Sequence, residues 1–270
     1  MKIHIFDVEQ GECNAIETPT GDLILIGAGH NSSTNWRPSN WLRQRNQRPH
    51  CIVLSNFDRD HLSDLPNFEP NIRPMTIKHN DFINPDWIEN TKIEESEEVH
   101  PGVQTALYWV RNVFTGDKIT PNYGMEKLFF QHSPSKFQDT NNLSVVTFIA
   151  YGNIGAMLPG DLETARWREF LKDQTFIDCL HRTNIFIASH HGRESGYCAE
   201  VFKYCSPDIV IISDKGIEYD TQRHSRYLPH ASGIQFGQNL RKVLTTRDDG
   251  KITIEIGNDG RYTVYINQSY

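Results

Sequence analysis

An apolar run that ends abruptly in metal-ligand side chains constrains this chain most. Residues 52–61 read Ile-Val-Leu-Ser-Asn-Phe-Asp-Arg-Asp-His. The apolar part is typical of a short buried strand, and α/β folds place chemistry in the loops that follow such strands. Alternate residues of an extended loop point the same way, so Asn56, Asp58 and Asp60 would face one point. His61 reaches the same point from the turn, and two carboxylates with an imidazole suit a divalent cation.

Composition narrows the class of protein. The 270 residues suffice for one large domain or two small ones, and 37% hydrophobic with 23% charged residues indicates a globular core. A formal charge of −7 does not favour broad electrostatic binding to nucleic acid. The five cysteines lack a C-x-x-C pair, which indicates buried thiols in a reducing compartment. No apolar run approaches the ~20 residues of a membrane helix, so we expect a soluble, cytoplasmic protein with no membrane partner.

The hydrophobic pattern predicts two β-rich halves with helices between them. Strands are predicted at residues 2–8, 13–18, 23–26, 52–54, 76–78, 128–132, 145–150, 155–158, 184–188, 208–213, 253–256 and 262–266. Helices are predicted from near Ser39 and at residues 103–114, 165–171 and 198–204. We therefore predict an α/β (α+β) protein, a four-layer αββα sandwich. Residues 1–270 would form one domain, with an irregular helical insertion at about 62–125.

The segment around the first predicted helix is rich in arginine. Residues 36–48 contain Arg37, Arg43, Arg45 and Arg48, and no acidic residue. One interpretation is a phosphate-contacting patch interleaved with aromatic rings. The other, which we favour, is the solvated face of a helix.

Further ligand-type residues follow other predicted strands. Asp161 comes after Pro-Gly at the end of one strand, His190 and His191 after another, and His230 lies in the loop beyond Ser213. Each has an ordinary explanation alone, since Asp161 could cap a helix and the histidines could sit in turns or surface loops. Their recurrence at separate strand ends favours one shared site at one edge of the sandwich.

The motifs resemble those of metallo-β-lactamase fold hydrolases, specifically the hydrolase domain of ComEC-type competence proteins and their free-standing relatives. The resemblance covers nearly the whole chain. In chain order, residues 6–12 are similar to the family's D-V-G-Q-G-D, 25–29 to L-I-D-T-G, 55–61 to H-x-H-x-D-H, 142–144 to N-x-S, 160–161 to G-D, 190–192 to H-H-G, 227–232 to Y-G-H-P-S and 247–252 to T-x-x-D-G-x-I.

The resemblance implies divalent metal binding, by Zn²⁺ or Mn²⁺, with one or two ions per chain. It implies an intact second metal site formed by Asp60, His61, Asp161 and one of His190 and His191. The first site departs from the family, because Asn56 and Asp58 replace two histidines and Gly27 replaces an aspartate. Asp58, Asn56 as a further candidate, and the bridging Asp161 would leave an oxygen-rich first site that suits Mn²⁺, Mg²⁺ or no metal.

The leading hypothesis is a metal-dependent phosphodiesterase of nuclease type, acting on nucleic acid or a nucleotide. The resemblance implies that Asp60 and His230 are catalytic, with His230 donating to the leaving oxygen or holding a phosphate oxygen. Asn142 and Ser144 would hydrogen-bond the substrate. Arg59 would either reach a phosphate or neutralise its neighbours Asp58 and Asp60.

A second hypothesis comes from the missing first-site histidines. The chain would then be a catalytically degraded member that binds a ligand or a protein partner without turnover. Lactam or thioester hydrolysis is a third and weaker interpretation, because the resemblance is to the competence branch. Metal stoichiometry, together with the effect of Asp161→Ala on any activity found, separates the first two hypotheses.

Overall fold

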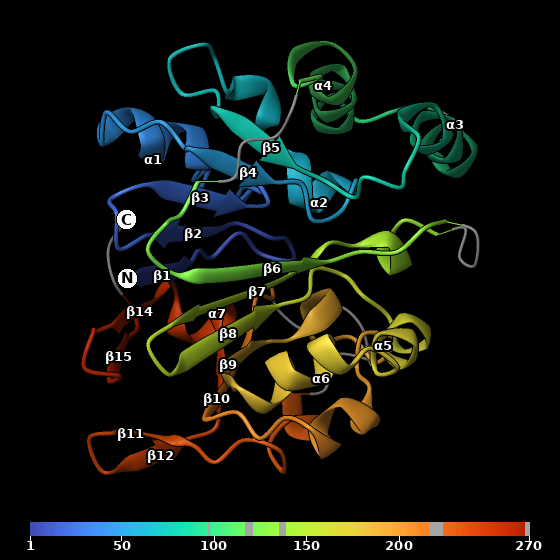
Figure 1. Cartoon of the computed structure of the whole chain (residues 1–270). Helices are drawn as coiled ribbons and strands as arrows, with labels where there is room; N and C mark the ends of the chain where they lie inside the picture. Colours follow the sequence, from blue (N-terminus) through green and yellow to red (C-terminus); the bar gives the residue numbers. More distant parts are fainter. Residues whose placement is uncertain (97, 117–120, 135–138, 216–223, 268–270) are drawn as a thin grey trace.

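The computed structural model describes residues 1–96, 98–116, 121–134, 139–215 and 224–267. Two β-sheets lie face to face, and helices cover their outer faces (Figure 1). The first sheet runs in the order β15 (Tyr262–Tyr265), β14 (Ile252–Ile256), β1 (Lys2–Ile5), β2 (Asn14–Glu17), β3 (Leu23–Ile26), β4 (Cys51–Val53) and β5 (Thr76–Lys78). Its strands are antiparallel from β15 to β3 and parallel from β3 to β5.

The second sheet completes the sandwich. Its order is β13 (Val243–Thr245), β10 (Ile209–Ile212), β9 (Thr183–Ile187), β8 (Ile154–Leu158), β7 (Val146–Tyr151) and β6 (Glu126–Phe130). Strands β13, β10, β9 and β8 are parallel, and β7 and β6 are antiparallel to their neighbours. A separate ribbon pairs β11 (Ile234–Phe236) with β12 (Asn239–Arg241).

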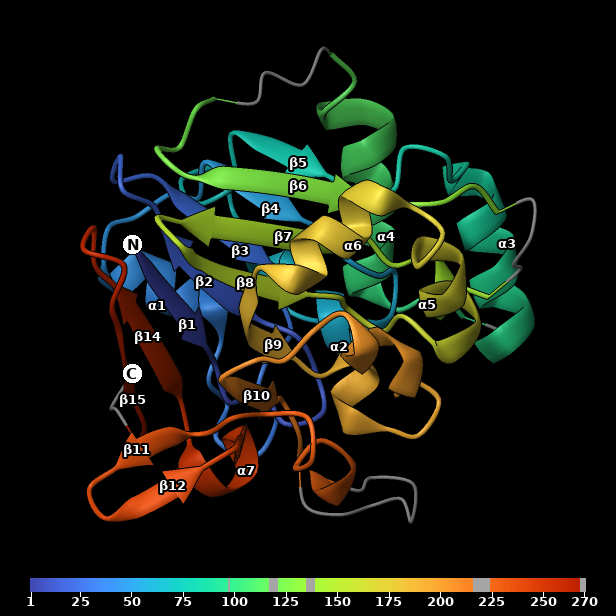
Figure 2. The ribbon, with the colours of Figure 1, turned by 60° about the horizontal axis from the view of Figure 1, so that its bottom comes forward.

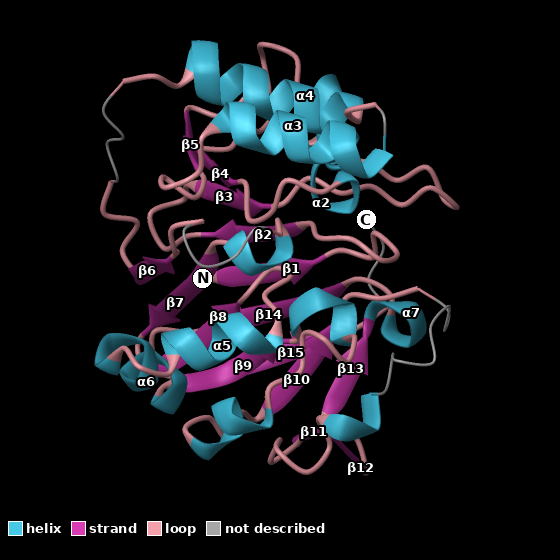
Figure 3. Cartoon of the chain, turned by 90° about the vertical axis from the view of Figure 1, so that its right-hand side faces the viewer, coloured by secondary structure: helices cyan, strands magenta, loops and turns pink. Residues whose placement is uncertain are grey.

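The α-helices are α1 (Pro38–Gln44), α2 (Arg59–Leu62), α3 (Pro85–Ser96), α4 (Pro101–Tyr108), α5 (Thr164–Phe170), α6 (Gln174–His181) and α7 (Thr246–Asp249). The labelled helices other than α2 and α7 lie on the two outer faces (Figure 3). Helices α1, α3 and α4 lie beyond the first sheet, and α5 and α6 lie across the second (Figure 2).

Side-chain alternation along the strands produces three apolar cores between four layers. In β3, Ile24 and Ile26 face the second sheet, whereas Leu25 packs with Trp41 and Leu42 of α1. A third core joins the outer face of the second sheet to Trp167 and other side chains of α5 and α6. Because each sheet is apolar on both faces, each must be covered twice, and the predicted αββα sandwich is confirmed.

Several local predictions differ from the structure. The predicted helix 103–114 ends as α-helix at Tyr108 and continues as the π-helix Trp109–Val113. The predicted helix 198–204 is the 3₁₀ helix Ala199–Lys203. Helix α6 was missed, although Phe176, Cys179 and Leu180 have helical spacing and are buried.

The arginine-rich segment is held by contacts within the chain. Arg37 pairs with Asp64, and the guanidinium of Arg45 pairs with Glu17 and stacks on Trp41. The guanidinium groups of Arg43 and Arg48 donate to backbone carbonyls. These contacts support the interpretation as a structural helix face and not as a phosphate-binding patch.

Two features bear on the compartment predictions. All five cysteines lie in the described part of the chain, where they are buried and form no disulfide. Among the described helices, none combines the length and apolar character needed to cross a membrane.

Candidate metal centre

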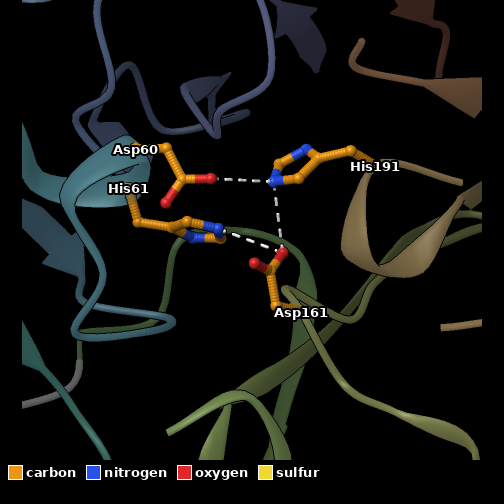
Figure 4. A group of neighbouring side chains, drawn as sticks. All are labelled: Asp60, His61, Asp161 and His191. Carbon is orange, nitrogen blue, oxygen red and sulfur yellow. Dashed lines mark ion pairs between the residues drawn. The ribbon is translucent and has the colours of Figure 1, made fainter. Parts of the chain in front are cut away.

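Four predicted ligands come together where strands of both sheets end. Asp60 and His61 lie on α2, just after β4. Asp161 follows β8, and His191 lies in the 3₁₀ turn Ser189–Gly192 after β9. One ligand atom from each lies within 4.8 Å of all the others. Asp60 and His61 approach from one side and His191 from the other, with Asp161 between them (Figure 4).

The facing atoms lie within ion-pair distance of one another (Figure 4). His61 Nε2 lies 3.0 Å from Asp161 Oδ1, and His191 Nε2 lies 3.4 Å from that oxygen and 3.2 Å from Asp60 Oδ2. Nevertheless His61 Nε2, His191 Nε2 and Asp161 Oδ1 are buried and make no hydrogen bond within the described chain. Buried polar atoms rarely lack partners, so atoms aimed together in this way indicate a common partner between them.

The outer nitrogens of both histidines are held by protein groups. His191 Nδ1 lies 3.1 Å from the Ser213 carbonyl oxygen, which can only accept, so Nδ1 carries a proton, and Nε2 offers a lone pair when the ring is neutral. His61 Nδ1 lies 3.2 Å from Glu12 Oε2 and 3.1 Å from Ser55 Oγ. Metal-binding histidines are commonly oriented by such partners. The donor set is thus two imidazole nitrogens and two carboxylates.

The same proximity controls protonation in the metal-free protein. Burial alone would lower the pKa of His61, but Asp161 and Asp60 raise it well above its usual range. Burial likewise opposes the charged form of His191, but Asp161 and Asp60 raise its pKa to about 10. The two histidines hold the pKa of Asp161 well below its usual range, against the effect of burial. Such a site prefers two carboxylates balanced by positive charge, which a divalent ion can supply.

A sharp turn selects one of two adjacent histidines. His190 and His191 have φ values of 50° and 54°, a left-handed conformation that costs about 1–3 kcal/mol per residue. His191 turns into the cluster, whereas His190 Nδ1 lies 3.0 Å from Ser195 Oγ and 3.4 Å from Glu163 Oε1. The sequence left this choice open, and the structure places His190 outside the cluster.

The Asp161 loop is fixed by hydrogen bonds from neighbouring segments. The Asp161 amide donates to Ser144 Oγ at 3.1 Å, and the His190 amide donates to the Gly160 carbonyl at 3.1 Å. Gly160 has φ 61°, a conformation that favours glycine. Ser144 is buried and therefore acts here on the loop that carries Asp161.

Two further turns lock the start of α2. The Glu12 amide donates to the Asp60 carbonyl at 3.3 Å, and the Ala28 amide donates to the His61 carbonyl at 2.6 Å. Gly29 leaves no room for a side chain, because a Cβ there would lie 2.3 Å from the Asp60 carbonyl oxygen. Close backbone packing therefore positions both ligands of α2.

The predicted first metal position already contains a cation. Lys92 of α3 donates to Asp58 Oδ1, and its ammonium lies 2.7 Å from Glu95 Oε2. The Asn56 amide donates to Asp58 Oδ2 at 2.6 Å and to Asn141 Oδ1 at 3.1 Å. Within the residues that the structure describes, a group of metal-ligand side chains of this kind occurs only at Asp60, His61, Asp161 and His191. The structure thus places Asp58 and Asn56 in a lysine-centred network.

The remaining predicted residues are distributed as follows. Asn142 is buried, and its Nδ2 donates to Asp139 at 3.0 Å. His230 Nε2 lies 2.8 Å from the Tyr197 hydroxyl, and its ring stacks on Phe202 at 4.1 Å. Arg59 is exposed and makes no ion pair with Asp58 or Asp60 within the described chain.

Space adjoins the cluster on two sides. A small void of about 10 Å³ is bordered by His61, Asp161 and His191. This volume is enough for one water molecule or ion. A pocket of about 350 Å³ is open to solvent and is lined by Asp60, Arg59 and His30, among others. Sequence reasoning missed Glu12 and Ser213 as parts of this region, although Glu12 stands in the motif at residues 6–12.

Comparisons with known proteins yield distant similarity. No protein-family model and no curated protein matches the sequence. Similar solved structures include one described as a new diphosphatase from the PhnP family, with TM-score 0.44, 9% identity, and coverage of 92% of this chain and 96% of that one. Zn²⁺-bound PqqB from Methylobacterium extorquens has TM-score 0.38, 12% identity, and coverage of 69% and 72%. The resemblance to competence-type hydrolases stays a prediction.

Proposed function

We propose that this protein is a hydrolase that depends on one divalent metal ion and acts on a phosphoester. The observation that carries the proposal is the convergence of His61 Nε2, His191 Nε2 and Asp161 Oδ1, which are buried and make no hydrogen bond with the described chain. Two imidazoles with two carboxylates suit Zn²⁺ or Mn²⁺. A divalent ion held there would supply Lewis-acid activation of water and of the bond to be cleaved.

Lys92 supports a count of one ion. Its ammonium neutralises Asp58, which the sequence offers as a ligand of a first metal. Burial opposes the charged lysine, but Asp58 and Glu95 raise the pKa of Lys92, so the ammonium persists at neutral pH. A second divalent cation would have to displace this ammonium from Asp58, against Coulomb repulsion.

The phosphoester class is supported by the charge beside the centre. Arg59 precedes the ligand Asp60 and lines the same pocket, and a guanidinium is well suited to phosphate oxygens. Nucleic acid or a nucleotide is the finer prediction from the sequence resemblance. The chain's formal charge of −7 and the engaged arginines Arg37 and Arg45, which flank α1, favour a nucleotide-sized substrate over a polymer.

A second candidate function is ligand binding without turnover. The observation that favours it is the same Lys92–Asp58 pair. Lys92 occupies Asp58, a predicted ligand of the first metal, so a binuclear centre would lack one of its two ions. A single ion is sufficient for hydrolysis in many enzymes, so the two candidates differ in activity and not in metal content.

Metal content and phosphoesterase activity test both candidates together. We expect about one Zn²⁺ or Mn²⁺ per purified chain by mass spectrometry, with loss of the ion in Asp60→Ala/His61→Ala and in Asp161→Ala. Hydrolysis of nitrophenyl phosphate esters should follow the metal content. One bound ion with no hydrolysis of any phosphoester would favour the binding candidate. Absence of metal after soaking in Zn²⁺ and Mn²⁺ would refute the metal-dependent function.

A further inference from the structure

The pocket beside the centre meets it at one ligand. The side chain of Asp60 is 37% exposed, whereas those of Asp161 and His191 are each 5% exposed and that of His61 is fully buried. Asp60 also lines the pocket of about 350 Å³ together with Val8, Glu9, Gln10, His30, Ser32, Arg59 and Ser63. A molecule in this pocket therefore lies against the exposed side of the cluster. Its volume is in the usual range for small-molecule sites.

His30 presents a defined nitrogen to this pocket. Ser63 Oγ accepts from the His30 amide at 3.2 Å and lies 2.6 Å from His30 Nδ1. In the tautomer that the proposal uses, the Ser63 hydroxyl donates its proton to Nδ1. Neutral His30 then carries its own proton on Nε2. Burial and the nearby arginines Arg37 and Arg59 lower the pKa of His30, which keeps it neutral.

Arg59 supplies positive charge at the same wall. It is exposed, and no carboxylate of the described chain lies within ion-pairing distance of it. Its charge acts on the rings around it, since it contributes to the lowered pKa of both His30 and His100. Arg59 also lines the neighbouring pocket that contains Lys92. The guanidinium is thus available to an anion from solvent.

The acidic groups of the pocket are already engaged. Glu9 accepts from Ser32 Oγ at 2.6 Å and from the Ser33 amide at 3.1 Å. Asp60 Oδ2 faces His191 Nε2 at 3.2 Å. The donors that remain for a ligand include the Arg59 guanidinium, the Nε2–H of His30 and the Gln10 amide nitrogen Nε2, which makes no hydrogen bond within the described chain. A planar cation beside a neutral N–H donor suits the oxygens of a phosphate group.

We propose that Arg59 and His30 form an anion subsite that binds the phosphate group of a small phosphorylated molecule and holds it against Asp60. The inference rests on the proposed function for its choice of phosphate. It assigns Arg59 the phosphate-binding alternative of the two that the sequence allows. Ser63 acts through His30, as a positioning residue that fixes the ring and its protonation.

Calorimetric titration with inorganic phosphate tests the subsite directly. The full-length protein would be titrated in its metal-loaded form and after chelator treatment, with metal content measured in parallel. We expect Arg59→Gln to weaken phosphate binding about tenfold or more in both forms, and His30→Phe to weaken it several-fold. Arg59→Lys should bind phosphate with intermediate affinity, because lysine keeps the positive charge but lacks the two parallel N–H donors of the guanidinium. Metal content should be unchanged in all three variants.

Arg261→Gln is the matched control for loss of one positive charge. Its side chain is 89% exposed on the β14–β15 hairpin, and we expect wild-type phosphate affinity. Equal affinity of wild type and Arg59→Gln, or absence of phosphate binding by the wild type, would overturn the subsite. If instead the wild type holds no metal but the chelator-treated protein shows the Arg59 dependence, the metal proposal fails and the subsite stands.

Competition decides the size of the ligand. A single nucleoside monophosphate should displace phosphate with an affinity at least equal to that of a short single-stranded oligonucleotide. An oligonucleotide that binds about tenfold more tightly, with a steep salt dependence, would contradict the small-molecule class.

Discussion

The Nδ1 atom of His61 lies 3.2 Å from Oε2 of Glu12, although 49 residues separate them in the chain. Glu12 lies in the turn between β1 and β2, and Ser55 at the end of β4 donates to the same carboxylate oxygen. Glu12 thus contacts the outer nitrogen of His61, whose inner nitrogen Nε2 faces the candidate metal centre. Such an outer partner keeps the ligand ring in one orientation and increases its basicity.

Glu12→Ala should lower metal affinity roughly 10- to 100-fold, because His61 loses the group that orients its ring. Glu12→Gln keeps an acceptor oxygen, so its metal affinity should lie between those of the wild type and Glu12→Ala. Metal affinity can be measured by competition with a chromophoric chelator. Glu17→Ala is the control. It removes a β2 carboxylate that pairs with Arg45, and it should leave the metal affinity unchanged. A wild-type affinity in Glu12→Ala would refute the orienting role.

The two adjacent histidines should behave differently. His191→Ala removes a ligand and should abolish stoichiometric metal binding. His190→Ala removes contacts with Ser195 and Glu163 and should leave about one ion per chain. The readout is metal content by mass spectrometry on protein that retains its circular dichroism spectrum. If His190→Ala lost the metal and His191→Ala kept it, the ligand would be His190, and the assignment of His191 would be wrong.

Stability of the metal-free protein should decrease between neutral and alkaline pH. The pKa of His191 is raised to about 10 in the folded protein, mainly by Asp161 against the effect of burial. Its unfolded value is about 6.5. The stabilisation by the protonated ring is therefore fully present below about pH 6.5 and is lost as the pH rises through about 10. Urea unfolding of chelator-treated protein across this range measures the decrease.

Metal affinity should change in the opposite direction over the same range. A bound ion displaces the proton from His191, so its apparent affinity should increase by up to about tenfold per pH unit for each displaced proton. Asp161 stays ionised throughout, because its pKa lies well below the usual value. A metal affinity that does not vary with pH would show that the histidines are neutral in the metal-free protein.

Lys92→Met should destabilise the protein by roughly 2 kcal/mol, because it leaves the Asp58 carboxylate partly buried without its cation. The side chains of Lys92 and Asp58 are 11% and 23% exposed. The double variant Lys92→Met/Asp58→Asn should recover part of the loss. Lys172→Met, which removes a lysine side chain that is 69% exposed and pairs with Glu169, should change the free energy of unfolding by less than about 0.5 kcal/mol. Equal effects of the two single variants would show that the Lys92–Asp58 pair has no special role.

The sequence by itself determined the layers and the chemical type of the site. Strands such as β3 and β4 are apolar on both faces, and this requires a covered sheet whatever the connections. The residues that follow β4, β8 and β9 are aspartates and histidines, and parallel neighbouring strands bring their carboxyl ends to one edge. Ligand types and their order along the chain were therefore readable without coordinates.

Tertiary structure alone decided which of these side chains meet. Adjacent residues such as His190 and His191 have the same sequence signal, and only the left-handed turn directs one ring into the cluster. Lys92 is 34 residues from Asp58, and its ammonium reaches that carboxylate only because α3 packs over this end of the sheet. Side-chain direction depends on packing between segments distant in sequence, and local residue patterns contain no record of that packing.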